Sequence, residues 1–186
     1  MRVIAGLVGG RRLLAPEGQH TRPTSDRVKE ALFSALEPYL EGARVLDLYA
    51  GSGALGIEAL SRGAVGAVFV ERDRRAAELI RRNLEAVGLS GGVRRVTSVE
   101  QYCRAPVDGP FDIVLADPPY DMAGSQILAC LDDLATAGGM SATARVVVER
   151  RRSREALPSG GGVAWERTRT YGDTTLIMGK AKETRS

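Results

Sequence analysis

Short runs that could form strands alternate with helix-patterned segments along most of this 186-residue chain. The strand-like runs lie at 43–48, 67–70, 93–97, 111–116 and 145–149. The segments with a helical spacing of apolar residues lie between them, at 54–62, 73–87 and 124–135. Strands that alternate with helices pair in parallel through right-handed crossovers. The chain is therefore expected to adopt an α/β fold with a doubly wound, mostly parallel sheet.

The two ends of the chain depart from this alternation. Residues 2–15 are typical of a β-hairpin, and a helix is predicted over 26–40. Two runs at 163–170 and 174–178 predict an antiparallel pair at the sheet edge. The two parts expected are an N-terminal extension and a main domain, 1–40 and 41–182.

Composition argues against several classes of protein. No apolar run approaches the ~20 residues that span a bilayer. The first residues lack the apolar segment of a secretory signal, so a cytoplasmic protein is expected. Cys103 and Cys130 have no metal-like spacing and are expected to be reduced thiols. His20 is the sole histidine, which argues against a histidine-based metal site or a Ser-His-Asp triad. No metal site is predicted.

A glycine-rich turn follows the run at 43–48. Gly51, Gly53 and Gly56 satisfy the G-x-G-x-x-G spacing, and Glu71 follows Gly51 by 20 residues, at the end of the next strand. Such a turn lets a ligand approach the backbone, and the acid can accept a hydrogen bond from a ribose hydroxyl. This spacing favours a nucleotide-like cofactor, with a tight strand-to-helix turn as the structural alternative.

Asp47, four residues before the first glycine, changes which cofactor is favoured. Its carboxylate would repel a pyrophosphate but attract the ammonium of S-adenosylmethionine, which has no phosphate. Asp47 would contact the methionine part directly or through water, Glu71 the ribose, and Glu100 falls where an adenine contact is expected. The predicted cofactor-binding residues are Asp47, Tyr49, Ala50, Gly51, Gly53, Glu71, Arg72, Glu100 and Asp117.

The tetrapeptide Asp117-Pro118-Pro119-Tyr120 directly follows the run at 111–116. Its prolines end the strand and stiffen the backbone at the edge where open α/β sheets bind their ligands. The Asp117 carboxylate and the Pro118 carbonyl can accept hydrogen bonds from both N–H groups of an exocyclic amine. Tyr120 can stack on the base, which must be splayed out of its stack. Asp117, Pro118 and Tyr120 are therefore predicted to catalyse methylation of a nucleobase amine, with an Asp-Pro turn as the structural alternative.

Positive charge is concentrated at the two ends of the chain. Residues 1–29 hold six basic and two acidic side chains, and residues 144–186 hold ten basic and five acidic ones. This asymmetry is expected where a polyanion-binding surface flanks a small-molecule site, with solvated faces as the alternative. Arg2, Arg11 and Arg12 are predicted to contact RNA.

Four segments carry a resemblance, over nearly the whole chain, to the RsmD-type 16S rRNA guanine-N2 methyltransferases of bacteria. These enzymes are a branch of the class I S-adenosylmethionine-dependent methyltransferases. The segments are 2–6, 22–33, 45–59 and 117–120, of which 22–33 is the most specific. The resemblance implies a seven-stranded Rossmann-like sheet with a small N-terminal extension. It also implies that Arg22, Thr24 and Arg27 belong to the substrate site. Relatives often have an Asp near Glu100, which weakens the assignment of the adenine contact.

The resemblance further implies the reaction, N2 methylation of one guanine, at the position called 966, in 16S rRNA. The substrate would be an assembled or assembling small ribosomal subunit, and a monomeric enzyme is expected. Three alternatives stay open: an adenine-N6 DNA methyltransferase, which shares the tetrapeptide; an NAD-dependent oxidoreductase, which shares the glycine turn; and a non-catalytic RNA-binding assembly factor. The short chain argues against the DNA methyltransferase, because such enzymes usually carry a separate DNA-recognition domain. Asp47 argues against the oxidoreductase, and the intact acidic residues argue against a non-catalytic factor.

Overall fold

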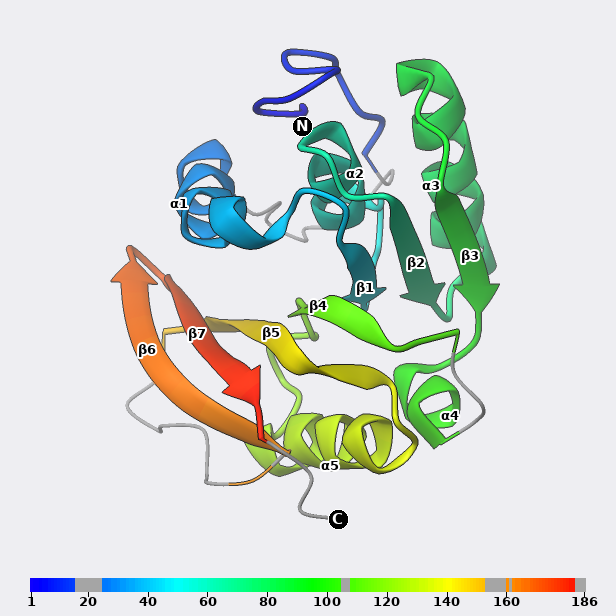
Figure 1. Cartoon of the computed structure of the whole chain (residues 1–186). Helices are drawn as coiled ribbons and strands as arrows, with labels where there is room; N and C mark the ends of the chain where they lie inside the picture. Colours follow the sequence, from blue (N-terminus) through cyan, green and yellow to red (C-terminus); the bar gives the residue numbers. More distant parts are fainter. Residues whose placement is uncertain (16–24, 105–107, 153–159, 161, 183–186) are drawn as a thin grey trace.

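The computed structural model of the chain describes residues 1–15, 25–104, 108–152, 160 and 162–182. Its centre is a seven-stranded sheet with the strand order β3-β2-β1-β4-β5-β7-β6 (Figure 1). The strands are β1 (Arg44–Leu48), β2 (Gly66–Glu71), β3 (Gly92–Val96), β4 (Phe111–Ala116), β5 (Met140–Arg151), β6 (Val163–Tyr171) and β7 (Thr174–Ala181).

The sheet is mixed, because one of its strands runs against the others. β1 to β5 pair in parallel, whereas β7 runs antiparallel to both of its neighbours, β5 and β6. The predicted α/β fold, its doubly wound sheet and its antiparallel edge pair are thereby confirmed. β5 is longer than the predicted run at 145–149, because β7 pairs with it as far as Arg151 and an irregularity in β4 lets Met140 pair with Phe111.

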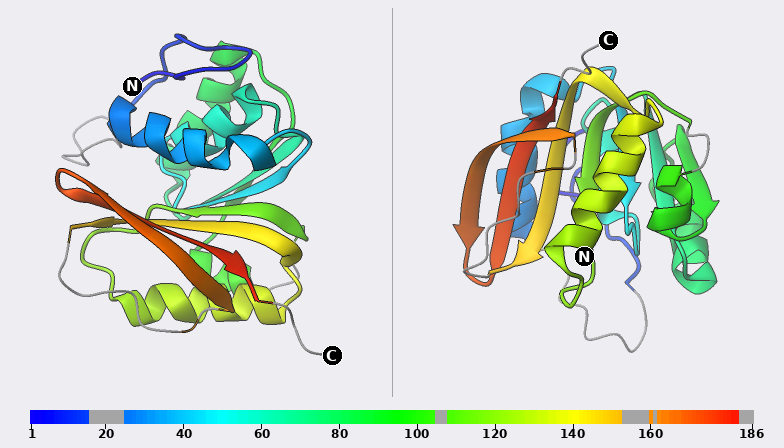
Figure 2. Two further views of the ribbon diagram at one scale, coloured as in Figure 1. Left: turned by 60° about the vertical axis from the view of Figure 1, so that its left-hand side comes forward. Right: turned by 90° about the horizontal axis from the view of Figure 1, so that it is seen from below.

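Helices cover both faces of the sheet (Figure 2). On one face lie α1 (Asp26–Leu36), α2 (Ala54–Ser61) and α3 (Arg74–Val87), and on the other lie α4 (Val99–Arg104) and α5 (Gly124–Thr136). Successive strand residues point to opposite faces, so Val45 packs with the first group and Leu46 with the second. Both faces are thus occupied by apolar packing, which leaves the strand ends for a site. None of the helices in the described ranges is both long and apolar enough to cross a membrane.

Two local predictions need correction, and one helix was not predicted. The helix predicted over 26–40 ends at Leu36 and continues only as the 3-10 turn η1 (Glu37–Tyr39), which contains Pro38; proline cannot supply a helical N–H and disfavours helix in the residue before it. The sequence did not predict α4, because six residues are too few to show a helical period. The predicted hairpin over 2–15 forms a single antiparallel bridge, between Arg2 and Arg12, rather than two regular strands.

Buried polar contacts attach the N-terminal arm, residues 1–14, to the helices beneath it. The fully buried Glu58 carboxylate of α2 accepts hydrogen bonds from the backbone N–H groups of Ile4 (2.7 Å) and Ala5 (3.0 Å). Lys29 of α1, also buried, forms an ion pair of 3.4 Å with Glu58. Apolar residues of the arm join the same core cluster as the sheet. The arm is therefore packed into the fold on this face.

Candidate active site

The turn between β1 and α2 has the backbone that its glycines predict. Gly51 and Gly53 adopt positive φ angles of 55° and 80°, a region that glycine enters without steric cost. A Cβ atom on Gly56 would lie 2.3 Å from the Phe69 ring of β2, so glycine is needed for α2 to pack this closely. Tyr49 also adopts a positive φ, of 60°, and a side chain there is strained. The turn is therefore tight both where the chain leaves β1, at Tyr49, and where it enters α2, at Gly51 and Gly53.

Asp47 lies beneath this turn. Its side chain is 1% exposed, and Oδ2 accepts a 2.8 Å hydrogen bond from the Gly56 backbone N–H. Burial raises the pKa of Asp47 well above its ordinary value, and the nearby charges of Asp117 and Glu71 raise it further. In this structure the carboxylate holds the glycine turn in place. Its contact with the methionine part of a cofactor stays a prediction.

Glu71, at the end of β2, joins the next strand to the same turn. Its Oε2 accepts a hydrogen bond from the Gly51 N–H at 2.9 Å, and its Oε1 accepts one from the Asp73 N–H at 2.8 Å. Arg72 is exposed, and Glu100 is half-buried in the first turn of α4. The predicted cofactor residues therefore lie at or directly after the carboxyl ends of the neighbouring strands β1, β2 and β3, at one edge of the sheet.

β4 brings the tetrapeptide to this edge. Ala116 pairs with Leu48 of β1, and the Asp117 N–H donates to the Leu48 carbonyl at 3.4 Å. Burial raises the pKa of Asp117 from its ordinary 3.8 to about 6. Pro118 is buried, whereas Tyr120 is 50% exposed. The structure thus brings the predicted catalytic group and the glycine turn together on adjacent parallel strands.

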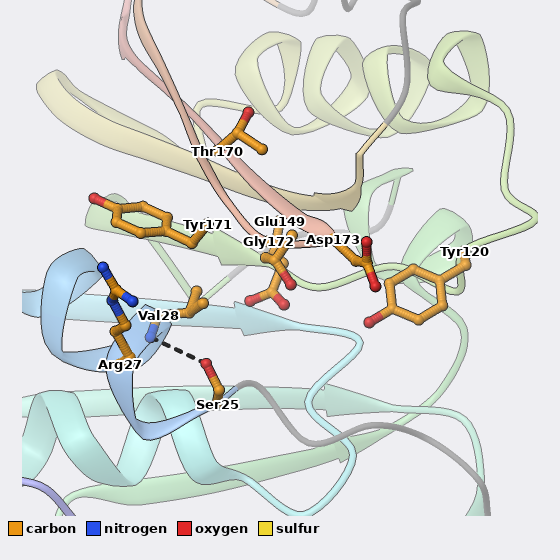
Figure 3. Close-up of a pocket in the computed structure, with 10 residues that line it drawn as sticks. Ser25, Arg27, Val28, Tyr120, Glu149, Thr170, Tyr171, Gly172 and Asp173 are labelled. Atoms are coloured by element: carbon orange, nitrogen blue, oxygen red, sulfur yellow. Dashed lines mark hydrogen bonds between the residues drawn. The ribbon is translucent and has the colours of Figure 1, made fainter.

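Tyr120 also borders a cavity of about 350 Å³ (Figure 3). Its walls come from the start of α1, the tetrapeptide, the end of β5 and the turn between β6 and β7. The lining residues are Ser25, Arg27, Val28, Tyr120, Glu149, Thr170, Tyr171, Gly172, Asp173 and Thr174. Ser25 also caps α1, since its Oγ accepts from the Val28 N–H at 3.3 Å. The volume lies in the range of small-molecule pockets.

Sequence reasoning missed several residues at this edge. Glu149 and Asp173 line the cavity, and the run Arg150–Arg152 borders a second hollow of about 160 Å³ with Pro118, Pro119 and Tyr120. The run could have been found, because it directly follows the strand predicted at 145–149. Asp117 was predicted as a site residue because it occupies the same kind of position, directly after a buried strand.

The arginines predicted to contact RNA in the N-terminal arm are partly engaged elsewhere. Arg2 forms a 2.8 Å ion pair with Asp26, and the Arg11 guanidinium donates to the Val87 carbonyl at 2.9 Å. Arg12 is exposed. None of these three borders the cavity. Their contact with RNA stays a prediction.

The predicted residues that follow the arm stand differently. Arg27 is exposed and lines the cavity. Arg22 and Thr24 lie outside the described residues. Lys29, which contributes to the basic count of this region, is 1% exposed and paired with Glu58. The positive charge that the region offers to a polyanion is therefore smaller than its composition indicates.

A buried asparagine of α3 links the arm to the glycine turn. The Asn83 Nδ2 group donates to the carbonyls of Ser52 (2.9 Å) and Leu14 (3.2 Å), and Oδ1 accepts from the Leu14 N–H at 2.8 Å. Ser52 stands between Gly51 and Gly53. Asn83 thus fixes the end of the arm against the turn. Among the described residues, no group of His, Cys, Asp and Glu is arranged to hold a metal ion.

Known proteins are similar to this chain in sequence and in fold. The chain is 36% identical over 186 residues to a Bacillus subtilis (strain 168) protein named "Putative rRNA methyltransferase YlbH", with 98% of this chain and 100% of that protein covered. It is 43% identical over 120 residues to "Ribosomal RNA small subunit methyltransferase D" of Escherichia coli (strain K12), a match that covers 64% of this chain and 60% of that protein. Among solved structures, the "Putative methyltransferase yhhF from Escherichia coli" aligns with a TM-score of 0.87 and 31% identity over 99% of both chains.

One family covers the arm, the glycine turn and the tetrapeptide together. The model of the family described as "Conserved hypothetical protein 95" matches residues 1–180. That range contains every residue predicted above to bind cofactor or substrate. The chain therefore belongs to this family, the RsmD family of class I methyltransferases.

Proposed function

We propose that this protein transfers a methyl group from S-adenosylmethionine to the exocyclic N2 amine of a guanine, position 966, in 16S rRNA of the small ribosomal subunit. One observation carries the proposal. The glycine turn after β1 and the tetrapeptide after β4 meet on neighbouring parallel strands, and Tyr120 of the tetrapeptide borders a cavity. The name of the Escherichia coli relative, a small-subunit rRNA methyltransferase, supports the choice of substrate.

The residues at this edge fit S-adenosylmethionine rather than a phosphate-containing cofactor. The acidic side chains at the glycine turn are Asp47, Glu71 and Asp117, and Glu100 follows β3 in the first turn of α4. The mutual repulsion that helps to raise the pKa of Asp47 would be relieved by a cationic ligand and increased by a pyrophosphate. Glu71 would hold the ribose, Asp47 the methionine part, and Glu100 the adenine. The bound cofactor supplies an electrophilic methyl group.

The tetrapeptide positions the amine. The Asp117 carboxylate and the Pro118 carbonyl accept hydrogen bonds from its two N–H groups, and Tyr120 stacks on the base. With a pKa of about 6, Asp117 is ionised at neutral pH and can still take the proton that the amine releases, unless water takes it. The contribution of these groups is chiefly orientation, because the methyl sulfonium is already a strong electrophile and the hydrogen bonds aim the lone pair of the amine at it.

The cavity supports guanine as the base. Its wall includes the carboxylates of Glu149 and Asp173. Guanine presents adjacent N1–H and N2–H donors on its Watson–Crick edge, which suit acidic acceptors. Adenine presents an acceptor at N1, which does not. This chemistry favours an rRNA guanine over a DNA adenine.

Labelling with radioactive S-adenosylmethionine tests the proposal. The substrates are small subunits that lack the modification, free 16S rRNA and double-stranded DNA. We expect label in small-subunit RNA, its loss in Asp117→Ala with cofactor binding retained, and full labelling by Asp121→Ala, which removes an exposed neighbouring carboxylate. Label on DNA adenine would instead indicate an adenine-N6 methyltransferase. RNA binding without label would indicate an assembly factor, and NAD binding in place of S-adenosylmethionine an oxidoreductase.

A further inference from the structure

Three consecutive arginines lie at the end of β5 beside the tetrapeptide: Arg150 and Arg151 are its last two residues, and Arg152 follows it. Their backbone is fixed, because Arg150 and Arg151 pair with Thr175 and Thr174 of β7. The Arg152 N–H donates to the Asp173 carbonyl at 2.6 Å. Arg150 is half-buried, and Arg151 and Arg152 are exposed. The run therefore presents three cationic side chains from a rigid strand end rather than from a loose loop.

Within the part of the chain that the structure describes, none of these three guanidinium groups forms an ion pair or a side-chain hydrogen bond. Arg145, on the same strand, is paired with Glu166 at 3.0 Å, and Arg62 of α2 is paired with Glu58 at 2.8 Å. The charge of the run is thus available to an external anion, unlike that of Arg145 and Arg62.

Tyr120 lines both the cavity and the smaller hollow that Arg150–Arg152 border. The hollow of about 160 Å³ is lined by Arg150–Arg152 together with Pro118, Pro119 and Tyr120, and Tyr120 also lines the larger cavity. A base stacked on Tyr120 would leave its sugar and phosphate near this hollow. Guanidinium groups bind phosphate oxygens in pairs, and phosphate contacts fix a nucleic acid in position.

We propose that Arg150–Arg152 bind the rRNA phosphates that flank the target nucleotide and hold its backbone while the base occupies the cavity. This inference rests on the proposed function, because it takes the base in the cavity to belong to RNA. It moves the main phosphate contact from the N-terminal arm, where Arg2 and Arg11 are engaged within the protein, to the end of β5. A flipped-out nucleotide needs such a hold, since unstacking costs a few kcal/mol.

The test compares two double variants with the same loss of charge. Arg151→Ala/Arg152→Ala removes the two exposed arginines of the run, and Arg75→Ala/Arg82→Ala removes two exposed arginines of α3 as the control. Both are assayed for methyl transfer to small subunits, for RNA binding between low and high salt, and for cofactor affinity. Exposed sites are chosen so that folding is retained, which circular dichroism checks.

We expect the run variant to raise the KM for small subunits at least tenfold, with kcat within about threefold of wild type and an unchanged cofactor Kd. Its slope of log affinity against log salt should fall by about one to two, since each lost phosphate contact contributes roughly 0.7–0.9. A KM and salt slope equal to those of the α3 control would overturn the inference while wild-type labelling of rRNA leaves the proposed function standing. Wild-type enzyme that labels no rRNA would instead overturn the proposed function.

Discussion

Replacing Asp117 with Asn separates the catalytic use of this carboxylate from its cost to folding. The pKa of Asp117 rises from 3.8 to about 6 because burial disfavours the charge. Each pH unit corresponds to about 1.4 kcal/mol, so the ionised group costs the fold up to about 3 kcal/mol at pH 7.5. Since the side chain is partly exposed, we expect Asp117→Asn to gain roughly 1–3 kcal/mol. In a domain of this size that corresponds to a rise in Tm of roughly 3–8 °C.

The stability that Asp117→Asn gains over wild type should increase as pH rises. The folded chain binds this proton more tightly than the unfolded chain, so the contribution of Asp117 to stability falls as pH rises from about 4 through about 6. The advantage of Asn should therefore be full above pH ~7 and disappear below pH ~4. Over the same range, wild-type kcat/KM should fall as Asp117 is protonated below pH ~6, because a neutral carboxyl is a weaker acceptor and base.

Paired melts and rate measurements check both halves of this reasoning. The melts run from pH 4 to pH 8 on wild type, Asp117→Asn and the exposed control Asp121→Asn. We expect Asp117→Asn to be more stable than wild type at pH 7.5 while its kcat falls about 100- to 10,000-fold, the range for loss of a general base. A variant that is less stable at pH 7.5 would refute the assigned burial cost. One that keeps wild-type kcat would refute the catalytic role.

Three further substitutions test the frame of the site. Glu71→Gln should raise the Kd for S-adenosylmethionine about tenfold in calorimetry by weakening the ribose contact, and an unchanged Kd would exclude that role. Lys29→Met should lower the free energy of unfolding in urea by about 2–4 kcal/mol, because it leaves the Glu58 carboxylate buried without one partner; a change below 0.5 kcal/mol would contradict the ion pair. Asn83→Ala should weaken cofactor binding about three- to tenfold by releasing Ser52, and Asn83→Asp, which loses the same donor, should do the same; wild-type affinity in both would show that the turn holds itself.

Local pattern was enough for most of the fold. A strand that alternates between two packed faces needs a short, almost continuous apolar run, and 111–116 shows such a run and forms β4 with the same bounds. Ligand binding at the carboxyl ends of parallel strands could be predicted, but the pairing of β1 with β4, which brings Asp117 beside the glycine turn, is shown only by the structure. α4 was not predicted, because its six residues, Val99–Arg104, are too few to show a helical period of apolar residues.

Partners across the fold could not be predicted in the same way. Lys29 and Glu58 are far apart in sequence, and each looks like an ordinary surface charge until α1 and α2 pack together. For the same reason the sequence could place Asp47 at the turn but not show that its carboxylate binds the Gly56 N–H. The charge of each segment predicted an RNA contact for Arg2 but did not distinguish Arg150–Arg152 from the other basic residues near the C-terminus. Whether a charged side chain can bind a ligand depends on its neighbours in the folded protein, and composition does not show these neighbours.

Nucleoside analysis of the reaction product tests the central claim most directly. Small subunits that lack the modification are treated with enzyme and S-adenosylmethionine, the 16S rRNA is digested, and the nucleosides are identified by chromatography and mass spectrometry. The proposed function predicts a single new nucleoside, N2-methylguanosine, whose amount approaches one per subunit with wild type and stays at background with Asp117→Ala. A methyl group on adenine or on a guanine ring nitrogen, or no methylated nucleoside with active cofactor binding, would contradict it.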